Sequence, residues 1–371
     1  NLAIICTRLD LIAEIISQLG VLGTRAVIIA PSFRDKLPEV EAEALRKAIL
    51  VAAREHTVRI LGPGCGGLLI PGIGLNASVS PIALKRGKIA LIAQSTAIAS
   101  AIVDHANSKG IGFSAVLHLG ESADIDLADV LDWFAEDHDT ARILVQFDSA
   151  SGGRKFMSAA RASARNKPVV AIRSQKIGKG KSAAKLPFSA DDVYEAALSR
   201  AGWVEVATLG EALEASQAVA RLRPMSGDGL TILANGDGLG RIAADVLLRN
   251  GGKLAVLQEK TLLELQKCLN SVSPLGNPLE LPPGIHADQW AAVLALILAD
   301  PNTNALMTVY SPSPFASSSE VATVIGAAGQ AAAQNIFTCW VGGASMQEAK
   351  QIADAHGVLS HDSPEQAVAV F

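Results

Sequence analysis

An internal repeat constrains this chain more than any other feature of its sequence. Residues 88–110, KIALIAQSTAIASAIVDHANSKG, align without a gap with residues 229–251, GLTILANGDGLGRIAADVLLRNG. Each copy has an apolar strand-like run, a turn with an amide side chain (Gln94 or Asn235), a helix-length stretch with an aspartate at the same point, and a closing glycine. The repeat therefore predicts two domains of the same fold.

Strand-like and helix-like runs alternate along the chain, which predicts parallel sheets covered by helices on both faces. After each copy of the repeat, the expected strands lie at residues 141–147 and 168–173, and at residues 305–310 and 335–341. Nearer the N-terminus, strands are expected at residues 26–30, 59–61 and 89–93 and helices at residues 10–19 and 39–56. The predicted fold class is α/β, with tandem doubly wound parallel sheets.

We expect three domains. Residues 1–86 read as half of a doubly wound unit, residues 87–225 contain the first copy of the repeat, and residues 228–371 contain the second. The polar stretch PMSGDG at residues 224–229 is the expected linker. The first residue is Asn1, not Met, and a strand-like run follows at once, so we expect an N-terminally truncated fragment, with a continuation after Phe371 equally compatible.

Composition and charge argue against several functional classes. The net charge is −4 and the basic residues are scattered, which argues against binding a nucleic-acid backbone. The apolar runs are far shorter than the roughly 20 residues that span a bilayer. No HExxH, GxSxG or GxxxxGK[ST] pattern occurs, which argues against a zinc protease, a serine hydrolase and a P-loop NTPase. We expect no metal site, and a cytoplasmic protein.

The cysteines point to the same compartment. Four cysteines lie far apart in apolar or glycine-rich surroundings, with no CxxC pair, at positions Cys6, Cys65, Cys268 and Cys339. We expect all four to be buried thiols in a reducing cytosol.

A glycine-rich turn, LGPGCGG at residues 61–67, follows an expected strand of the first domain. Turns at the carboxyl edge of a doubly wound sheet bind ligands, and amides without side chains can approach a phosphate there. The alternative is a turn that only closes the sheet. The sequence leaves both open.

Two strand-to-helix junctions are candidate anion sites. One is formed by residues 94–97 and the other by residues 235–240, its counterpart in the repeat. Amide groups and the positive end of a helix dipole favour an anion at such a junction. Ser and Asn are also ordinary helix caps. Because the junctions are equivalent, we expect them to face one charged group together.

Two further segments carry charge. Glu121, Asp124 and Asp126 precede an expected helix at residues 127–134, and such acids can transfer protons or bind metal. We favour the alternative, a negative first helical turn stabilised by the dipole. Residues 175–185 are basic and either reach a phosphate or form a solvated loop, which we favour.

The order of these motifs resembles that of NDP-forming acyl-CoA synthetases, over almost the whole chain. The matching positions are residues 62–67, 75–78, 94–95, 120–124, 154–156, 166–169, 192–194, 201–202, 235–236, 277–279 and 364–365. The resemblance implies that residues 1–86 are the latter part of a CoA-binding Rossmann domain. It implies that the next two domains are flavodoxin-like ligase domains related to succinyl-CoA synthetase. The family's ATP-grasp domain and first glycine-rich loop have no counterpart in this sequence.

In active members of that family a histidine, in a Ser-His-Thr-Gly loop after the strand equivalent to residues 169–173, carries the phosphoryl group. Here no histidine occurs between Asp139 and Ile285, and the corresponding loop, residues 181–187, reads KSAAKLP. Residues 96–98 replace a Ser-Gly turn, and Asp148 stands where the family has an orienting glutamate. We therefore assign no catalytic residue.

The same departures resemble the degenerate synthetase-like region of bacterial GNAT-type protein lysine acetyltransferases, above all at residues 94–97, 158–168 and 221–224. The resemblance implies a regulatory module that binds CoA or acetyl-CoA, forms a homo-oligomer, and has an ATP-grasp or GNAT domain in the same polypeptide or a partner subunit. Nucleotide is expected only with an ATP-grasp domain. The alternatives are an active NDP-forming acyl-CoA synthetase subunit and a structural scaffold.

The resemblance also implies the ligand contacts. The residues expected on the CoA side are Pro31, Ser32, Gly62, Pro63, Gly64 and Cys65. The residues expected to line the former phosphoryl site are Gln94, Ser95, Thr96, Ala97, Gly236, Asp237 and Gly238.

Overall fold

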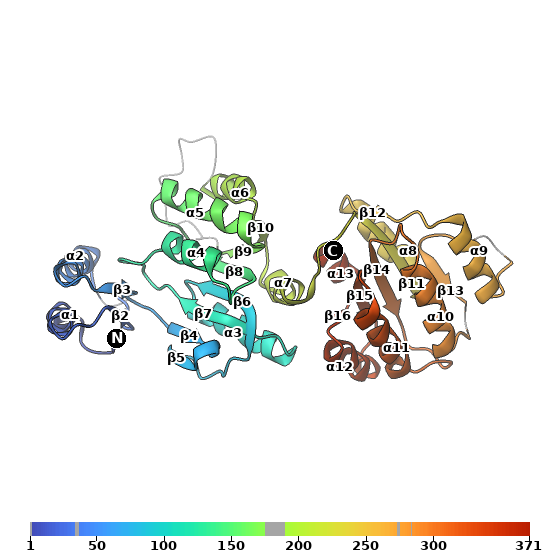
Figure 1. Ribbon diagram of the computed structural model, residues 1–371, viewed down its shortest axis with the longest axis horizontal. Coiled ribbons are helices and arrows are strands. Elements are labelled where there is room, and N and C mark those ends of the chain that lie inside the picture. The colour runs from blue at the N-terminus through green and yellow to red at the C-terminus, as the bar shows by residue number, and fades with distance from the viewer. Residues whose placement is uncertain (1, 34–36, 175–189, 273–274, 283) are drawn as a thin grey trace. The chain divides into compact units, whose positions relative to one another are not determined.

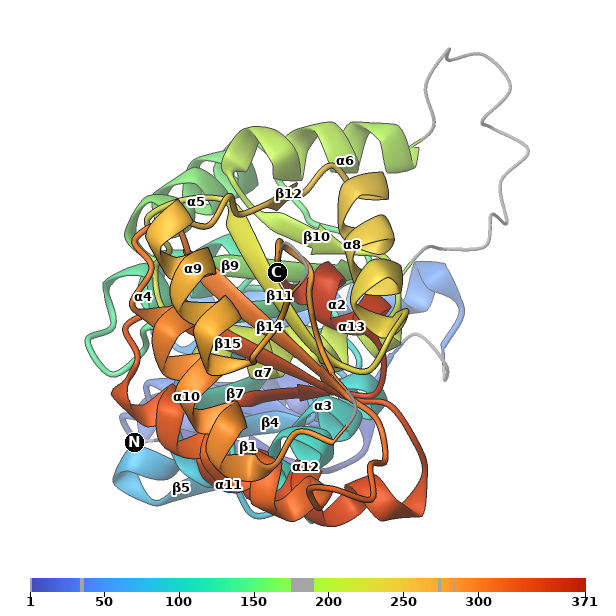
Figure 2. The same cartoon turned by 90° about the vertical axis from the view of Figure 1, so that its right-hand side faces the viewer.

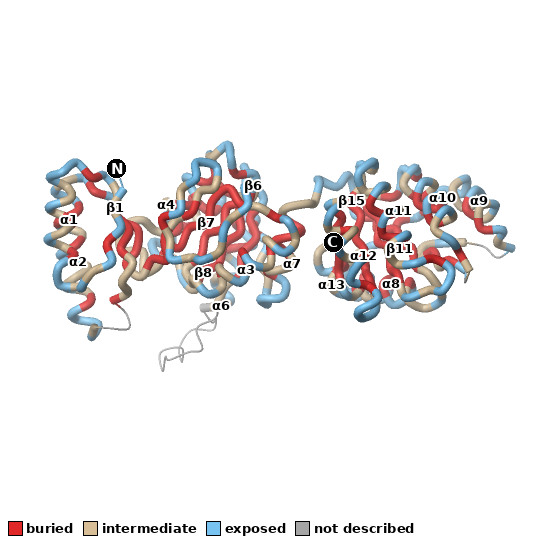
Figure 3. The backbone as a smooth tube through the Cα atoms, turned by 90° about the horizontal axis from the view of Figure 1, so that it is seen from below, coloured by how far each residue is buried: buried red, intermediate tan, exposed pale blue. Residues whose placement is uncertain are grey.

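The computed structural model describes the chain except residues 1, 34–36, 175–189, 273–274 and 283 (Figure 1). The described chain divides into two compact units, Asn1–Ala220 and Arg221–Phe371. In both units the buried residues concentrate in the strands and on the helix faces that cover them (Figure 3). Each unit therefore has a core of its own.

The first unit opens with a small parallel sheet. Its strands, in spatial order, are β1 (Leu2–Ile5), β2 (Ala26–Ile29) and β3 (Arg59–Leu61). Helices α1 (Ile12–Val21) and α2 (Glu39–Glu55) pack on one face through an aliphatic cluster that includes Ile16, Val27 and Ile49. Ile28 and Leu61 point to the other face and join the core of the larger sheet.

The larger sheet of this unit has the order β10-β9-β8-β6-β7-β4-β5. Its parallel strands are β6 (Arg86–Ala93), β7 (Phe113–His118), β8 (Arg142–Phe147), β9 (Val169–Arg173) and β10 (Val204–Val206). The antiparallel hairpin β4 (Gly67–Ile70) and β5 (Leu75–Ser78) extends it beside β7. This hairpin precedes residue 87, where we expect a domain boundary; the three-domain division stays a prediction.

Helices cover both faces of this sheet (Figure 1). One face carries α4 (Leu127–Glu136), α5 (Gly153–Asn166) and α6 (Ala190–Ala201). The other carries α3 (Thr96–Ser108) and α7 (Leu209–Arg221). Because the chain goes from β6 to one face and from β8 to the other, the connections diverge between these neighbouring strands. A crevice forms at such a switch point in doubly wound sheets.

The second unit repeats this plan. Its parallel strands, in spatial order, are β12 (Lys253–Leu254), β11 (Gly229–Asn235), β14 (Ala305–Tyr310), β15 (Asn335–Trp340) and β16 (Leu359–His361), and β13 (Leu279–Leu281) also pairs with β11. One face carries α8 (Leu239–Arg249) and α13 (Pro364–Val370), and the other carries α9 (Glu259–Cys268), α10 (Ala287–Leu298), α11 (Ser318–Ala331) and α12 (Gln347–Ala355) (Figure 2).

The predicted α/β fold class and the internal repeat are confirmed. The two copies become β6–α3 and β11–α8, and the order around them, β7-β6-β8-β9-β10 and β12-β11-β14-β15-β16, is the same. The expected strands and helices are present within a few residues of their predicted bounds, apart from the first helix, where residues 9–11 form a 3-10 turn before α1. Among the described residues, no helix has both the length and the apolar character needed to cross a membrane.

One glycine tests the packing of β4 against β5 within the hairpin. Gly67 has a φ of +103°, and a Cβ there would lie 2.2 Å from the Ala77 carbonyl oxygen in β5. We expect Gly67→Ala to lower the free energy of unfolding by about 2 kcal/mol or more, because strain and overlap combine. Gly210→Ala is the control, since its Cβ would come no closer than 3.8 Å to an atom outside its neighbours. Urea titration followed by circular dichroism measures both; equal midpoints would contradict this packing.

Candidate functional site

A cavity lies at the switch point of the large sheet, beside the carboxyl ends of β6 and β8. Its volume is about 260 Å³, and we call it the switch-point cavity. Its lining residues are Ser32, Gly64, Gln94, Gly120, Glu121, Ser122, Leu127, Asp148, Ser149, Ala150 and Ser151. Three of the predicted ligand residues, Ser32, Gly64 and Gln94, are thus brought together, although they are distant in sequence.

The Gln94 side chain joins the two sides of this switch point. Its Oε1 accepts a hydrogen bond from the Asp148 backbone N–H at 2.7 Å, and its Nε2 donates to the Ser149 carbonyl at 2.9 Å. Asn235 does the same in the second unit, where its amide exchanges hydrogen bonds of 2.7 and 2.8 Å with the backbone of Ser311. The two amides of the repeat therefore hold loops after neighbouring strands, and their contact with an anion stays a prediction.

Gln146, a residue that we did not single out from the sequence, holds together the strand ends at the same switch point. It is fully buried in β8, and its Oε1 accepts from the backbone N–H groups of Gln94 and Ser95 at 3.0 and 2.7 Å. Its Nε2 donates to Asp148 Oδ1 at 3.2 Å and to Ser174 Oγ at 3.0 Å. One side chain thus links the ends of β6, β8 and β9. A glutamine within the otherwise apolar run ILVQF, residues 143–147, was the available signal.

The start of α3 is capped by the chain itself. Ser95 is the N-cap, and its Oγ accepts from the Ile98 N–H at 3.4 Å, as the helix-cap interpretation predicts. Thr96 and Ala97 form the first turn, with Thr96 half-buried and Ala97 exposed. Neither lines the cavity. Their contact with a ligand stays a prediction.

Glu121 connects the cavity to the small sheet. Its side chain is 8% exposed, and Oε2 pairs with Arg46 at 3.3 Å. Its Oε1 accepts from Ser32 Oγ at 2.9 Å and from the Phe33 N–H at 2.8 Å. These partners lie almost 90 residues earlier in the chain, so Glu121 fixes the position of one sheet against the other.

The three acids of residues 120–126 therefore have separate structural tasks. Asp124 accepts from Arg59 and from the Ile60 N–H, both at 2.9 Å, and Asp126 is the N-cap of α4. The helix-start interpretation is right for Asp126 and wrong for Glu121 and Asp124, which bind the small sheet. Within the described ranges, no group of three His, Cys, Asp or Glu side chains is placed to bind a metal ion.

The glycine-rich turn after β3 fits between these two sheets. The N–H of Gly64 donates to the Pro31 carbonyl at 2.9 Å, and that of Cys65 donates to the Ile29 carbonyl at 3.2 Å. Gly62 has a φ of +105°, and a Cβ there would lie 2.5 Å from the Ile29 oxygen. The turn thus closes the sheet, and its contact with a ligand, the first of the two interpretations, stays a prediction. Both amides have in-chain acceptors, so a phosphate would have to displace them; of this turn, only Gly64 lines the cavity.

Cys65 is a packing residue in this turn. Its Sγ donates to the His118 carbonyl at 2.6 Å and accepts from the Gly67 N–H at 3.2 Å, and burial raises the pKa of the thiol to about 12. Cys339 is also buried, but Cys6 is exposed at the end of an edge strand and Cys268 is half-buried at the end of α9. The prediction of four buried thiols is therefore wrong for Cys6 and Cys268.

The predicted residues of the second unit lie in the turn between β11 and α8. The Gly238 N–H donates to Glu280 Oε1 at 2.7 Å, and the Arg241 N–H donates to the same oxygen at 3.4 Å. The chain's own Glu280 thus lies at this helix N-terminus, and the contact of Gly238 with a ligand anion stays a prediction. Gly236 is half-buried and Asp237 is exposed, and their contact with a ligand stays a prediction. The loop expected to correspond to the histidine loop, residues 181–187, lies outside the described residues, as does the basic stretch 175–185.

The Gln146 network gives a stability prediction. We expect Gln146→Leu to lower the free energy of unfolding by about 2–4 kcal/mol, because it leaves buried donors without their acceptor. Gln351→Leu, at an exposed position of α12, is the matched control and should shift it by less than about 0.5 kcal/mol. Urea titration measures both. A Gln146→Leu midpoint equal to that of the control would show that the network contributes no stability.

The cysteine environments predict selective alkylation. At about pH 8 we expect iodoacetamide to modify Cys6 in the folded protein and to leave Cys65 unmodified, because the thiolate is the nucleophile and the pKa of Cys65 is raised to about 12. In denaturant all four cysteines should react. Peptide mass spectrometry distinguishes the sites, and rapid native labelling of Cys65 would contradict its burial.

Comparison with known proteins adds independent findings. Residues 86–219 match the family model of the succinyl-CoA ligase like flavodoxin domain. This range begins with β6 and extends into α7, so it contains the large sheet except its β4–β5 hairpin.

Two archaeal relatives match nearly the whole chain. An ADP-forming acetate–CoA ligase I of Archaeoglobus fulgidus is 29% identical over 379 residues, which cover 99% of this chain and 53% of the relative. The alpha subunit of the ADP-forming acetate–CoA ligase I of Pyrococcus furiosus is 28% identical over 377 residues, covering 99% of this chain and 80% of that subunit. The chain thus spans about half the length of the first relative and four fifths of the second.

A solved structure shares the same fold. The apo form of the dinucleotide-forming acetyl-coenzyme A synthetase 1 of Ca. Korarchaeum cryptofilum superimposes with a TM-score of 0.91 at 26% identity, over 100% of this chain and 81% of that one. The domain match, the two relatives and this superposition agree with the order of motifs in the sequence. The chain belongs to the NDP-forming acyl-CoA synthetase superfamily.

Proposed function

We propose that this chain is a CoA- or acyl-CoA-binding module with a ligase-like fold that binds its ligand without passing a phosphoryl group through a histidine. The switch-point cavity is the observation that carries the proposal. Its walls come from the small sheet, through Ser32 and Gly64, and from the loop after β8, at residues 148–151. The named relatives are CoA ligases, which supports CoA as the ligand.

The size and chemistry of the cavity favour the pantetheine arm over the nucleotide end of CoA. A volume of about 260 Å³ is below the range of roughly 300–1,000 Å³ that encloses drug-sized ligands, so only part of CoA fits. The pantetheine arm is neutral and has two amide groups. The lining offers serine hydroxyls, and Ser122 Oγ is buried without a hydrogen-bond partner among the described residues. Ser122 is therefore our candidate for a ligand hydrogen bond.

The charges of the cavity favour the same orientation. The Glu121 carboxylate is balanced by Arg46, but Asp148, also in the lining, forms no ion pair with a described residue. A negative side chain here disfavours phosphate groups. We therefore place the diphosphate and the ribose phosphate of CoA outside this cavity, towards solvent.

The absence of histidine carries the second half of the proposal. No histidine occurs between residues 139 and 285, which includes the whole segment after β9. An imidazole holds a phosphoryl group in a readily transferable form, and the loop KSAAKLP has no histidine. His118, at the end of β7, is buried, and burial lowers its pKa. The module is thus proposed as a binding fold without ligase turnover.

A finer proposal concerns the whole protein. We infer that the module regulates a GNAT-type protein lysine acetyltransferase, present in the same polypeptide or as a partner, in a cytoplasmic homo-oligomer. The support is the resemblance of residues 94–97, 158–168 and 221–224 to that group. The complete reading frame and the proteins that co-purify with its product test it. A GNAT domain in either supports the inference, and an ATP-grasp domain with no GNAT domain in either contradicts it.

A working ligase subunit is the second candidate, favoured by the names of the relatives. Such a subunit would act with an ATP-grasp domain or subunit and form acyl-CoA by a route without the family's histidine. Incubation with acetyl-CoA, ADP and radiolabelled phosphate, together with the ATP-grasp partner, separates the candidates. Labelled ATP formed as acetyl-CoA is cleaved to acetate and CoA, or radiolabelled protein, would establish the ligase and overturn our first proposal.

Binding of acetyl-CoA tests the first proposal. We expect saturable heat in calorimetry and a higher melting temperature with acetyl-CoA. Ser151→Trp, at the exposed rim of the cavity, should weaken binding at least about tenfold, because the indole fills the space. Ser199→Trp, at an exposed position of α6, is the matched control and should bind as the parent does. No heat and no thermal shift would refute the proposal, and equal affinity of both variants would refute the cavity as the site.

A further inference from the structure

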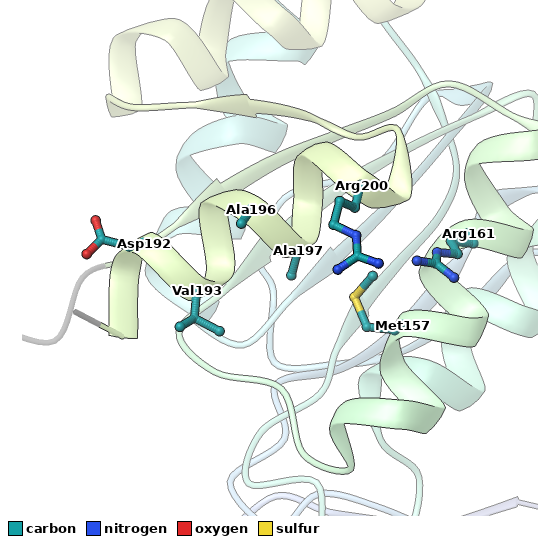
Figure 4. A pocket seen from close by; sticks show the side chains of 7 residues that line it. All are labelled: Met157, Arg161, Asp192, Val193, Ala196, Ala197 and Arg200. Atoms are coloured by element: carbon teal, nitrogen blue, oxygen red, sulfur yellow. The ribbon is translucent and has the colours of Figure 1, made fainter. Parts of the chain in front are cut away.

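A groove on the surface of the first unit lies between α5 and α6, on the solvent side of both helices (Figure 4). Two adjoining hollows form it. One of about 410 Å³ lies between α5 and α6, and one of about 550 Å³ continues along the exposed face of α5; both include Met157 and Arg161. We call this feature the α5–α6 groove. It takes no part in the switch-point cavity, since the two share no lining residue.

The floor of the groove is apolar. Met157 and Ala162 contribute from α5, and Val193, Ala196 and Ala197 contribute from α6. The α6 residues recur at the i, i+3 and i+4 spacing that places side chains on one face of a helix. Val193 is 61% exposed. A contiguous apolar strip on an exposed helix face is typical of a surface that a partner covers.

Four arginines border this floor. Arg154, Arg161 and Arg165 follow one face of α5, and Arg200 faces them from α6. In Figure 4 the side chains of Arg161 and Arg200 flank Met157. All four are exposed, and none forms an ion pair with another described residue, unlike Arg46, Arg59 and Arg173 of the same unit. The groove is therefore positive although the chain carries a net charge of −4.

We propose that the α5–α6 groove binds an acidic amphipathic helix of a protein partner. The groove follows α5 from Arg154 to Arg165, which corresponds to about three helical turns. A helix laid in it would place apolar side chains on the floor and glutamate or aspartate side chains against the arginines. Guanidinium groups match carboxylates with two parallel hydrogen bonds, so the arginines also fix the register of the bound helix.

A nucleic-acid partner fits this surface less well. A phosphate backbone offers no apolar counterpart for Met157 and Val193, and the lining contains no aromatic side chain on which a base could stack. Asp192 also lies at the α6 end of the groove, where it would face phosphates. A helix with leucines on one face and carboxylates beside them would contact both the apolar floor and the arginines.

The first test uses a fluorescein-labelled peptide of about 18 residues, with leucines at i, i+3 and i+4 and glutamates elsewhere, and a reference peptide with glutamine in place of glutamate. Fluorescence anisotropy should show binding of the glutamate peptide and much weaker binding of the glutamine peptide. Arg161→Glu/Arg165→Glu should weaken the glutamate peptide roughly tenfold or more. Arg54→Glu/Lys260→Glu, which changes the net charge equally at exposed positions elsewhere, should leave the affinity unchanged.

The second test separates the apolar floor from the charges. Val193→Ser should weaken the peptide a few-fold, and Val204→Ser, a 60% exposed valine of β10, should not. Raising NaCl from about 50 to about 300 mM should weaken the parent and have less effect on the double arginine variant. The proposal is overturned if duplex DNA competes with the peptide more strongly than unlabelled peptide does. It is also overturned if the double arginine variant binds the peptide with parental affinity. A third contrary result would be that the groove variants convert a dimer of this chain to a monomer without weakening the peptide.

Discussion

The buried amide of Gln146 is the interaction on which the functional end of the first unit depends. At the switch point of a doubly wound sheet, the connections that follow two neighbouring strands go to opposite faces of the sheet. The loops after these strands therefore need other contacts to hold them together. Gln146 supplies it by accepting two hydrogen bonds with Oε1 and donating two with Nε2. An amide side chain offers two acceptor positions and two donors in one plane, whereas a carboxylate would accept and not donate. An apolar residue would leave buried donors unsatisfied.

Hydrogen bonds within the chain also decide which N–H groups at the helix ends remain for a ligand. The backbone N–H groups of Gln94 and Ser95, before α3, are already bonded to Gln146, and those of Gly238 and Arg241, at α8, are bonded to Glu280. Positive helix ends attract anions, but here oxygen atoms of the chain itself accept hydrogen bonds from some of the N–H groups at these ends. A ligand that reaches the switch-point cavity therefore meets serine hydroxyls, backbone and the Asp148 carboxylate. This agrees with a neutral pantetheine arm in the cavity, as we propose.

The sequence predicted the features that depend on local order. The repeat gave the two equivalent β–α units, and the alternation of elements gave the α/β class, because both follow from patterns within about 20 residues. The contacts between distant segments were not readable. Glu121 was seen as one of three clustered acids, but its partners Ser32 and Phe33 lie almost 90 residues away. A single sequence contains no signal for such a pair, and the acids' separate tasks became visible only in the folded chain.

Gln146 and the α5–α6 groove were missed for different reasons. Gln146 stands in an apolar strand, where a lone polar residue is compatible with any face of the sheet until its partners are known. The arginines at 154, 161 and 165 do recur with helical spacing, but a charged helix face is usually solvated, and its meaning depends on α6 lying beside it. The spacing of the arginines predicts that they share one face of α5. That α6 lies beside this face is visible only in the folded chain.

The cavity and the groove are adjacent along one stretch of chain. Residues 148–151 line the cavity, and α5, which carries three of the four arginines, begins at Gly153. Gly152, between them, has a φ of +60°, a conformation that glycine adopts without strain. A ligand that changes the position of residues 148–151 therefore acts directly on the start of the helix that lines the groove. Linkage then requires that an occupied groove change the affinity of the cavity by the same factor. In the binding module that we propose, ligand and partner therefore have a physical route by which each changes the affinity of the other.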